Sequence, residues 1–372
     1  MFSNVSQICK EKGDYKMKET LKKLTRAVIA CMLVLAVFSE ASVADAVQKV
    51  TKTNVIGGEG WLDPKGEIAV SDGLALVNDN GKLKFVDKKG KTVIKCDKYD
   101  AAYGFSEGLA VVRKGYKYYG YIDKKGKEIV KCKYDEAYSF SGGLALVKKD
   151  GKYGFINKKG KLVIKCKYWG AHSFSDGLAL VREDVDWLYI NKKGEVVATS
   201  NYDEAYDFSE DLARVYKSAH GFDYINKKGE VVIEGQYAGA GNFSDGLAMV
   251  SNSDYKYGYI NKKGKQIIKY KYDVAYDFSD GLALVGKFDP YNSSMKFGYI
   301  NTKGKEVIKC RYTYAHDFSD GLALVSTDGI KWFYIDTNGK KVDKWEYSSA
   351  YDFSDGMTWA SKDGVQYLLS VK

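Results

Sequence analysis

The sequence predicts an all-β protein built from tandem repeats of about 35 residues, stacked as an open, solenoid-like array. A motif of the form Ser-Asp/Glu-Gly-Leu-Ala recurs through most of the chain. Each copy contains short apolar runs separated by tight-turn signals, and no stretch shows a helical period. Glycine is frequent (38 of 372 residues) and aromatic residues make up 14 %, but only two prolines occur, which excludes collagen-like chains and Pro-rich disorder.

The first 46 residues are organised like a secretory signal peptide. Basic residues between Lys18 and Arg26 precede an apolar run over residues 27–38, and Ala44 and Ala46 offer cleavage positions. The run is shorter than the roughly 20 residues of a membrane span, so cleavage is preferred over an anchor. Met17 is an alternative start, because residues 1–16 add nothing to such a signal. We expect a secreted or cell-surface protein without a transmembrane span after cleavage, with residues 47–56 as a linker.

The repeat array covers residues 57–372. Eight copies are complete, and partial copies flank them at both ends. At the fifth of the nine motif positions, Asp211 replaces the motif glycine. The motif glycines of the other copies are Gly73, Gly108, Gly143, Gly177, Gly246, Gly281, Gly321 and Gly356.

The copy that begins at Gly143 shows the elements of one repeat most clearly. Residues 144–147 form a first apolar run, Asp150-Gly151 is a hairpin signal, and residues 153–156 form a second run. A second turn at residues 157–160 ends in a glycine, and a third run rich in β-branched residues begins at residue 162. Three strands and two tight turns predict an antiparallel meander in each repeat.

The return segment, residues 168–175 in this copy, carries the predicted core. Its Tyr168, Ala171 and Phe174 have a counterpart in every complete copy. Such columns are explained by packing, because a meander of this size must bury one face against its neighbour to be stable.

The repeat resembles the WG-repeat family of bacterial β-repeats. The resemblance rests on residues 153–161 and on the later Phe174-Ser175-Asp176-Gly177 motif, repeated in order over residues 57–372. Where the family has Trp-Gly, this chain has pairs such as Tyr153-Gly154 and Tyr257-Gly258, and it lacks the family's Pro pair. The resemblance implies a binding or scaffold module, of an exported bacterial type, and no shared reaction.

A closed, β-propeller-like ring is the alternative arrangement. Propeller blades have four strands, whereas three are predicted here, which favours the open array. The N-terminal fragment, residues 61–70, supplies a turn and a third-strand piece, however, while residues 357–369 supply the first two strands. These fragments could complete each other across a ring closure.

Lysines of the second turn are the candidate binding residues. Because the same turn recurs on the same edge of each copy, they should form a basic rim, separate from a band of the motif acids. A linear polyanion, such as a cell-wall polymer or acidic glycan, or a surface protein is the expected partner, and solubility is the plainer explanation. The rim consists of Lys88, Lys89, Lys124, Lys125, Lys158, Lys159, Lys192, Lys193, Lys227, Lys228, Lys262, Lys263 and Lys303.

An insertion at residues 286–296 is a second candidate binding element. It lengthens the first hairpin of its repeat and exposes Phe288 and Tyr291. Insertions in repeat arrays map to loops, which often carry contacts.

No catalytic or metal site is expected, because most polar residues recur once per repeat and no hydrolase, zincin or phosphate-loop motif occurs. His172 and His316 replace a Tyr of other copies, so packing explains them. Cys96, Cys132, Cys166 and Cys310 share one register and are expected to be free thiols. We therefore expect a non-catalytic binding protein without cofactors; nucleic acid is a weak candidate. The alternatives are a structural spacer without ligand and a propeller-type glycan hydrolase.

Overall fold

The computed structural model describes residues 51–54, 59–60, 70–200, 202–291 and 293–371. The chain divides into two compact units, Met1–Gln48 and Lys49–Lys372. The predicted signal peptide and most of the linker therefore lie outside the described residues. All strands discussed below belong to the second unit, which contains its own hydrophobic core.

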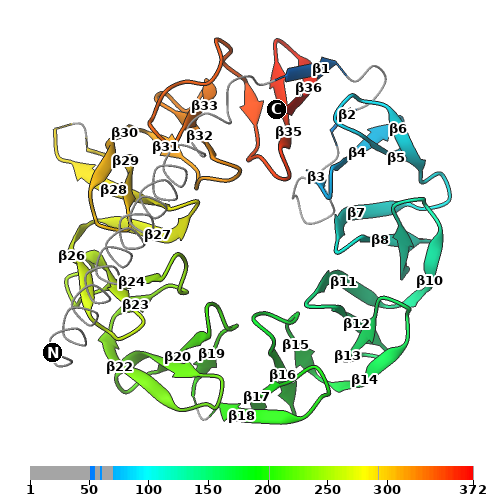
Figure 1. Cartoon of the computed structure of the whole chain (residues 1–372), viewed down its shortest axis with the longest axis horizontal. Helices are drawn as coiled ribbons and strands as arrows, with labels where there is room; N and C mark the ends of the chain where they lie inside the picture. The colour runs from blue at the N-terminus through cyan, green and yellow to red at the C-terminus, as the bar shows by residue number, and fades with distance from the viewer. Residues whose placement is uncertain (1–50, 55–58, 61–69, 201, 292, 372) are drawn as a thin grey trace, which may run out of the picture. The chain divides into compact units, whose positions relative to one another are not determined.

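The unit Lys49–Lys372 is a closed ring of nine antiparallel sheets, which we call blades 1 to 9 (Figure 1). Blade 3 shows the common plan: β11 (Glu136–Ser141), β12 (Leu144–Lys149), β13 (Lys152–Asn157) and β14 (Leu162–Tyr168) pair in chain order. The first strand of a blade lies nearest the centre of the ring and the fourth lies outermost (Figure 1).

The other blades follow this plan with strands of differing length. Blade 1 contains β2 (Glu59–Gly60), β3 (Val70–Ser71), β4 (Leu74–Asp79), β5 (Lys82–Val86) and β6 (Thr92–Lys95). Blade 2 contains β7 (Ala101–Ser106), β8 (Leu109–Lys114), β9 (Tyr118–Asp123) and β10 (Glu128–Tyr134). Blade 4 contains β15 (Gly170–Ala171), β16 (Ala179–Glu183), β17 (Asp186–Ile190) and β18 (Val196–Ser200). Blade 5 contains β19 (Glu204–Ala205), β20 (Leu212–Lys217), β21 (Gly221–Asn226) and β22 (Val231–Tyr237).

Blade 6 contains β23 (Gly239–Ala240), β24 (Leu247–Ser251), β25 (Tyr257–Asn261) and β26 (Gln266–Tyr272). Blade 7 contains β27 (Val274–Ser279), β28 (Leu282–Asp289), β29 (Ser294–Asn301) and β30 (Glu306–Tyr312). Blade 8 contains β31 (Tyr314–Ala315), β32 (Leu322–Ser326) and β33 (Trp332–Asp336), and the segment after them contributes only isolated bridges. Blade 9 contains β34 (Ser349–Ala350), β35 (Met357–Lys362) and β36 (Val365–Ser370).

The two ends of the ring meet in blade 9. Strand β1 (Thr51–Asn54) pairs antiparallel with β36, so that Thr51 lies opposite Ser370 and Asn54 opposite Tyr367. The N-terminal strand thus becomes the outermost strand of the last blade. This pairing removes the free edge that the C-terminal blade would otherwise present.

The predicted open array is wrong, and so is the three-stranded repeat, although the all-β class is confirmed. The return segment that carries the core columns itself contains a strand, for example β11, and this strand pairs with the first predicted strand of the following repeat. Some of these inner strands have only two residues, as in β15 and β19, so they carry little strand pattern. Closure follows from β1, whose partner is more than 300 residues away in sequence.

The core lies between successive blades. The Phe column is buried in every blade from Phe105 to Phe353, as expected. A second aromatic column, on the third strand, was not foreseen: Tyr259 is fully buried and its ring packs edge-to-face on Phe278 of the next blade, with centroids 5.0 Å apart. Its hydroxyl donates to the carbonyl oxygen of Tyr276 at 2.8 Å, which satisfies the buried polar group.

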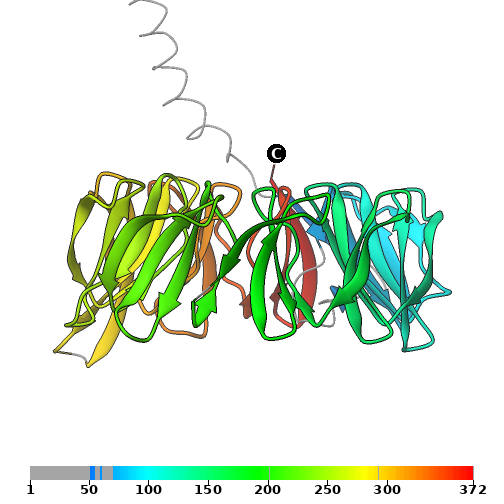
Figure 2. The same cartoon turned by 90° about the horizontal axis from the view of Figure 1, so that it is seen from below.

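The two ends of the blades form two faces of the ring (Figure 2). Because the strands alternate in direction, the turns after the first and third strands lie at one end, which we call the turn face. The hairpins between second and third strands and the connections between blades lie at the other end, the hairpin face. In Figure 2 the turn face is uppermost and the hairpin of β28 and β29 extends furthest down.

Candidate functional site

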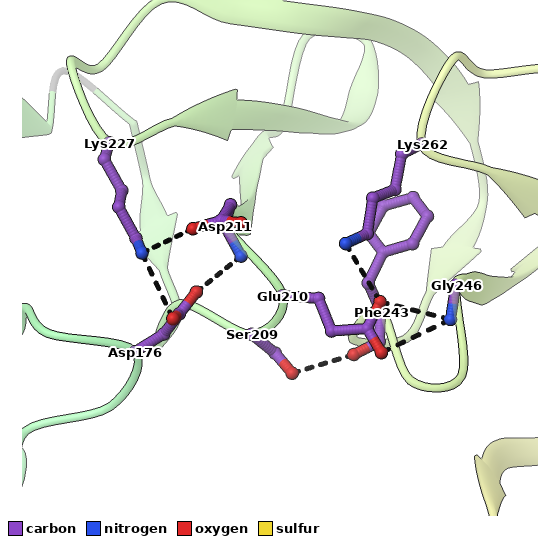
Figure 3. A network of polar contacts seen from close by, with 8 residues as sticks. All are labelled: Asp176, Ser209, Glu210, Asp211, Lys227, Phe243, Gly246 and Lys262. Atoms are coloured by element: carbon purple, nitrogen blue, oxygen red, sulfur yellow. Dashed lines mark hydrogen bonds and ion pairs between the residues drawn. The ribbon is translucent and has the colours of Figure 1, made fainter. Parts of the chain in front are cut away.

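A polar network joins neighbouring blades on the turn face (Figure 3). Glu210, in the first turn of blade 5, accepts a hydrogen bond from the backbone N–H of Gly246 in blade 6 (3.1 Å). The same carboxylate is 3.1 Å from Lys262 Nζ in the second turn of blade 6. Ser209 Oγ donates to the carbonyl oxygen of Phe243 at 2.7 Å. One first turn thus holds both turns of the next blade.

This arrangement recurs around the ring. The acid that precedes the motif glycine accepts the backbone N–H of the corresponding turn in the next blade, and it has a positive φ near 50° in each case. The last pair, from Asp355 to Asp72, crosses the ring closure. The bonded pairs are Asp72–Gly108, Glu107–Gly143, Asp176–Asp211, Glu210–Gly246, Asp245–Gly281, Asp280–Gly321, Asp320–Gly356 and Asp355–Asp72.

One junction of the described ring lacks this link. Blade 3 has Gly142 at the acid position, with φ of +61°, so blade 4 meets no carboxylate there. A Cβ built on Gly142 would lie 3.2 Å from Lys192 Nζ. Lys192 thus lies where the lysines of other blades meet the acid of the preceding blade. The site is therefore an internal comparison for the other eight junctions.

The polar network lowers the pKa of two of its carboxyl groups. Burial opposes ionisation of Glu107, but hydrogen bonds from Lys158 and from the backbone N–H of Gly143 outweigh it and lower the pKa of this carboxyl. The hydrogen bond from Lys227 likewise lowers the pKa of Asp211. Glu107 and Asp211 are therefore anionic partners of Lys158 and Lys227 at neutral pH.

The structure divides the lysines of the predicted rim into two sets. The first lysine of the second turn contacts the acid of the preceding blade: Lys124 with Asp72 (3.5 Å) and Lys158 with Glu107 (3.0 Å) are examples. Lys227 and Lys262 behave in the same way, whereas Lys192 faces Gly142. Lys88 occupies the same turn position in blade 1. It also interacts with another group of the protein and lines a pocket together with Asp355 and Gly356 of blade 9.

The second lysine of each turn is exposed. Its backbone N–H donates to the Asn or Asp that opens the turn, as Lys159 does to Asn157 at 3.0 Å, which points the side chain outwards. No ion pair involves these side chains among the described residues. The exposed set, which we call the outer lysines, is Lys89, Lys125, Lys159, Lys193, Lys228, Lys263 and Lys303.

The expected separation of a basic rim from an acidic band is wrong. Both turns lie at the same end of the blades, because an antiparallel meander places its first and third turns together. The motif acids and the first lysines consequently pair with each other, and the outer lysines lie beyond them.

A further set of lysines was missed from the sequence, although its recurrence was visible. The residue after the turn glycine is an exposed lysine in six blades and extends the basic surface. Blades 4 and 5 have Glu195 and Glu230 there, and both carboxylates bind the side-chain amide of their turn Asn. The basic surface is therefore weakest at these two blades. The six are Lys91, Lys127, Lys161, Lys265, Lys305 and Lys340.

The second predicted binding element lies on the opposite face. Phe288 is 52 % exposed and Tyr291 is 96 % exposed, on the long hairpin formed by β28 and β29. The structure thus does not bring the two candidate elements together. They belong to separate surfaces.

Two histidines pack alike on the inner strands, at junctions four blades apart. His172 Nδ1 lies 3.0 Å from Asp207 Oδ1, and its ring packs edge-to-face on Trp187. His316 lies 2.9 Å from Asp352 and packs on Trp332 in the same way. The hydrogen bond to the carboxylate raises the pKa of each histidine. Both therefore pack in place of Tyr, as expected. Each also forms a hydrogen bond to an Asp of the next blade, and the strength of this bond depends on the protonation of the histidine.

The remaining groups offer no comparable centre. The four cysteines are free, and burial raises the pKa of Cys96 to about 12. A cavity of about 580 Å³ lies between blades 4 and 5, lined by Ala198, Tyr202, Lys217 and Lys228 among others. In the described part of the chain, no three or more His, Cys, Asp or Glu residues are placed to hold a metal ion. The same residues contain no helix long and apolar enough to cross a membrane.

A closed ring of small antiparallel sheets, with turns gathered on two faces, defines the chain as a β-propeller. It belongs to the family of WG-containing repeats, which confirms the resemblance seen in the sequence. The family's profile matches eight consecutive segments, residues 85–118, 119–153, 153–184, 188–218, 224–256, 257–287, 297–329 and 332–365.

The likeness to solved structures concerns the fold alone, and of the three named here only the first has a TM-score above 0.5. The crystal structure of a eukaryotic initiation factor has 8 % identity and a TM-score of 0.54, with 82 % of this chain and 89 % of that chain covered. BamB from Moraxella catarrhalis has 12 % identity and a TM-score of 0.42, covering 87 % and 98 %. The C-terminal WD40 domain of Sif2 has 10 % identity and a TM-score of 0.42, covering 86 % and 98 %. A search of curated protein sequences gives no match.

Proposed function

We propose that this propeller is a non-catalytic binding module, exported to the cell envelope, whose turn face holds a linear anionic polymer through the outer lysines. The observation that carries the proposal is the division of the turn lysines. The first lysine of a turn is used by the protein itself, as in the pair of Lys262 with Glu210 (3.1 Å). The second, such as Lys263, is exposed and has no ion pair among the described residues.

Geometry supports a linear rather than a compact ligand. The outer lysines occur once per blade in blades 1 to 7, at the same position of the same turn, so their charges follow an arc of the ring. A chain that carries one anion per repeat unit can contact several blades at once, and multivalency raises its affinity without any single strong contact. Cell-wall polymers and acidic glycans have this chemistry.

The non-catalytic assignment is supported by repetition. Polar contacts on the turn face recur from blade to blade, whereas catalysis requires a singular arrangement of groups. The turn acids accept hydrogen bonds from backbone N–H groups of the next blade, and several also pair with lysines. They therefore hold neighbouring blades together.

Matched lysine variants test the proposal. In residues 49–372, one variant carries Lys125→Ser, Lys159→Ser, Lys228→Ser and Lys263→Ser, and its control carries Ser at Lys124, Lys158, Lys227 and Lys262. Both lose the same formal charge from adjacent positions. Affinity for poly(glycerol phosphate) and polygalacturonate at low salt should fall about tenfold or more in the first variant, and less in the control.

Stability should respond in the opposite way. The control variant loses ion pairs between blades and should unfold at lower urea concentration, whereas the first variant should not. Absence of polymer binding by the unsubstituted protein at low salt, or equal loss of affinity in both variants, would contradict the proposal and favour a spacer without ligand.

A further inference from the structure

Exposed apolar side chains gather on the hairpin face. Among the described residues nine large apolar side chains are more than half exposed, and only Val196 lies away from this face. Isolated apolar residues are common on protein surfaces, but their segregation to one of two faces calls for a specific cause. The other eight are Tyr116, Trp169, Val185, Tyr255, Phe288, Tyr291, Tyr314 and Ile330.

The hairpins of blades 6, 7 and 8 carry the most prominent group. Tyr255 is 73 % exposed, Tyr291 is 96 % exposed and Ile330 is 72 % exposed, each in the hairpin of a different, neighbouring blade. The blade 7 hairpin also reaches furthest from the ring (Figure 2). These tips project outwards instead of covering the core.

The three hairpins are braced against one another. Asp273, between blades 6 and 7, pairs with Lys256 of the blade 6 hairpin and accepts the backbone N–H of Phe288 in the blade 7 hairpin (2.8 Å). Thr313, between blades 7 and 8, accepts a hydrogen bond from Lys296 Nζ at 3.0 Å and donates to the carbonyl oxygen of Thr327 at 2.7 Å. Bracing fixes the tips before any partner binds, which lowers the entropy cost of binding.

Three lysines near these tips already form ion pairs within the protein. Lys287 pairs with Glu306 at 2.9 Å and Lys331 lies 3.6 Å from Glu346, while Lys256 pairs with Asp273 as above. These lysines are therefore not available to attract an anionic partner, and the exposed Asp254 and Asp328 lie near two of the tips. This separates the hairpin face from the turn face.

The arrangement of the tips fits a flat partner. The hairpin of β8 and β9, which carries Tyr116 (82 % exposed), follows a strand, β8, that lies on the opposite side of the ring from β28 and β29 (Figure 1). An extended, planar surface contacts both sides at once. Tyr and Trp favour the interface between water and lipid, where the ring is buried and its polar end stays hydrated.

We propose that the hairpin face docks on the surface of a lipid bilayer, with Tyr255, Tyr291 and Ile330 inserted at the level of the headgroups. This inference does not depend on polymer binding by the turn face. Together, the two faces would hold an anionic polymer on one side and a membrane on the other.

Co-sedimentation of residues 49–372 with vesicles of pure phosphatidylcholine tests the docking. The unsubstituted protein should sediment with the vesicles at both low and high salt, because apolar insertion is not screened. A variant with Tyr255→Ser, Tyr291→Ser and Ile330→Ser should bind the vesicles at least about tenfold more weakly. The substitutions are at exposed tips, and circular dichroism checks that the fold is kept.

A turn-face variant, Lys125→Ser, Lys159→Ser and Lys263→Ser, provides the matched control and should sediment like the unsubstituted protein. The proposal is overturned if the unsubstituted protein stays in the supernatant, or if the tip variant sediments equally well. Sedimentation without vesicles that depends on protein concentration and is lost in the tip variant would instead assign the surface to a second copy of the chain. Polymer affinity, measured separately, reports on the turn face alone.

Discussion

Single residues of the repeat act on the blade that follows them. Ser209 donates to Phe243, Glu210 holds Gly246, and Tyr224 donates to the carbonyl oxygen of Gly241, all in the next blade. The Phe column could be predicted as core because a large apolar residue that recurs in every copy must be buried. The hydroxyl partners of the Tyr column could not, because they depend on how blades face each other.

Gly142 allows a residue-scale test of the links between blades. Gly142→Asp should be more stable than Gly142→Ala by about 1 kcal/mol, since only the carboxylate can accept the N–H of Gly177 and meet Lys192. Both substitutions place a side chain at φ +61°, so the backbone cost is shared. Urea unfolding of the two variants measures the difference. Equal stability of the two variants would show that a carboxylate at this position adds nothing to the free energy of unfolding. It would also argue against a stabilising role for the same contact at the other junctions.

The two inner-strand histidines allow a test by pH. Their hydrogen bonds to Asp207 and Asp352 raise the pKa of both in the folded state. Their contribution to stability is therefore full below the unfolded pKa of about 6.5 and is lost as pH rises through the folded pKa. The change should stay below about 1 kcal/mol, because both side chains are over 40 % exposed.

The control for that change comes from the chain itself. Most other blades have Tyr at this position, for example Tyr138 and Tyr276. His172→Tyr combined with His316→Tyr should flatten the stability curve above about pH 6.5. Asp317, whose pKa burial and the nearby Asp352 raise to about 6, titrates mainly below that window. An unchanged slope in the double variant would show that the links are not ionised in the folded protein.

At the scale of the blade, the second and third strands and both tight turns were predictable from the sequence. The hairpin signal Asp150-Gly151 and the turn of Asn157 to Gly160 lie where they were expected. The inner strand was not predicted, because five of these strands have only two residues. So short a strand shows no alternation of apolar and polar residues, and its residues were interpreted as a connecting segment. Its pairing with the next strand depends on tertiary packing more than on local propensity.

The third strand shows why a glycine recurs in the Tyr-Gly pair. A Cβ on Gly154 would lie 2.6 Å from the carbonyl oxygen of Ile164 and 2.7 Å from the backbone nitrogen of Cys166, where β14 shifts register against β13. Blade 4 has Leu188 at this position and pairs there without a shift next to it. The glycine thus belongs to the irregular pairing of the outer strand.

Gly154→Ala should therefore destabilise the protein by about 2 kcal/mol or more, because backbone atoms on the next strand must move. The exposed Lys165→Ala on β14 is the control and should change stability by less than about 0.5 kcal/mol. The midpoint of urea unfolding measures both. Equal effects would mean that the strand pair accepts a Cβ at Gly154 without rearrangement.

At the scale of the whole molecule, the sequence favoured an open array because three strands per repeat were predicted, whereas the terminal fragments suit either capping or closure. A contact between β1 and β36 leaves no periodic signal, since each strand occurs once. The placement of the motif acids at the same end as the turn lysines follows only when the inner strand is known. The hairpin and the lysine turn are consecutive turns of a meander, so they lie at opposite ends with three strands as with four.

Ring closure by the two chain ends is the central claim, since both faces depend on nine blades that share one orientation. Thr51 and Ser370 are partners in the β1–β36 register, at a distance that suits a disulfide. In a Thr51→Cys, Ser370→Cys variant, mild oxidation should give an intramolecular disulfide between these positions, identified by mass spectrometry of peptides from the monomer. Free thiols at both positions, or disulfides only between chains, would contradict the closed ring.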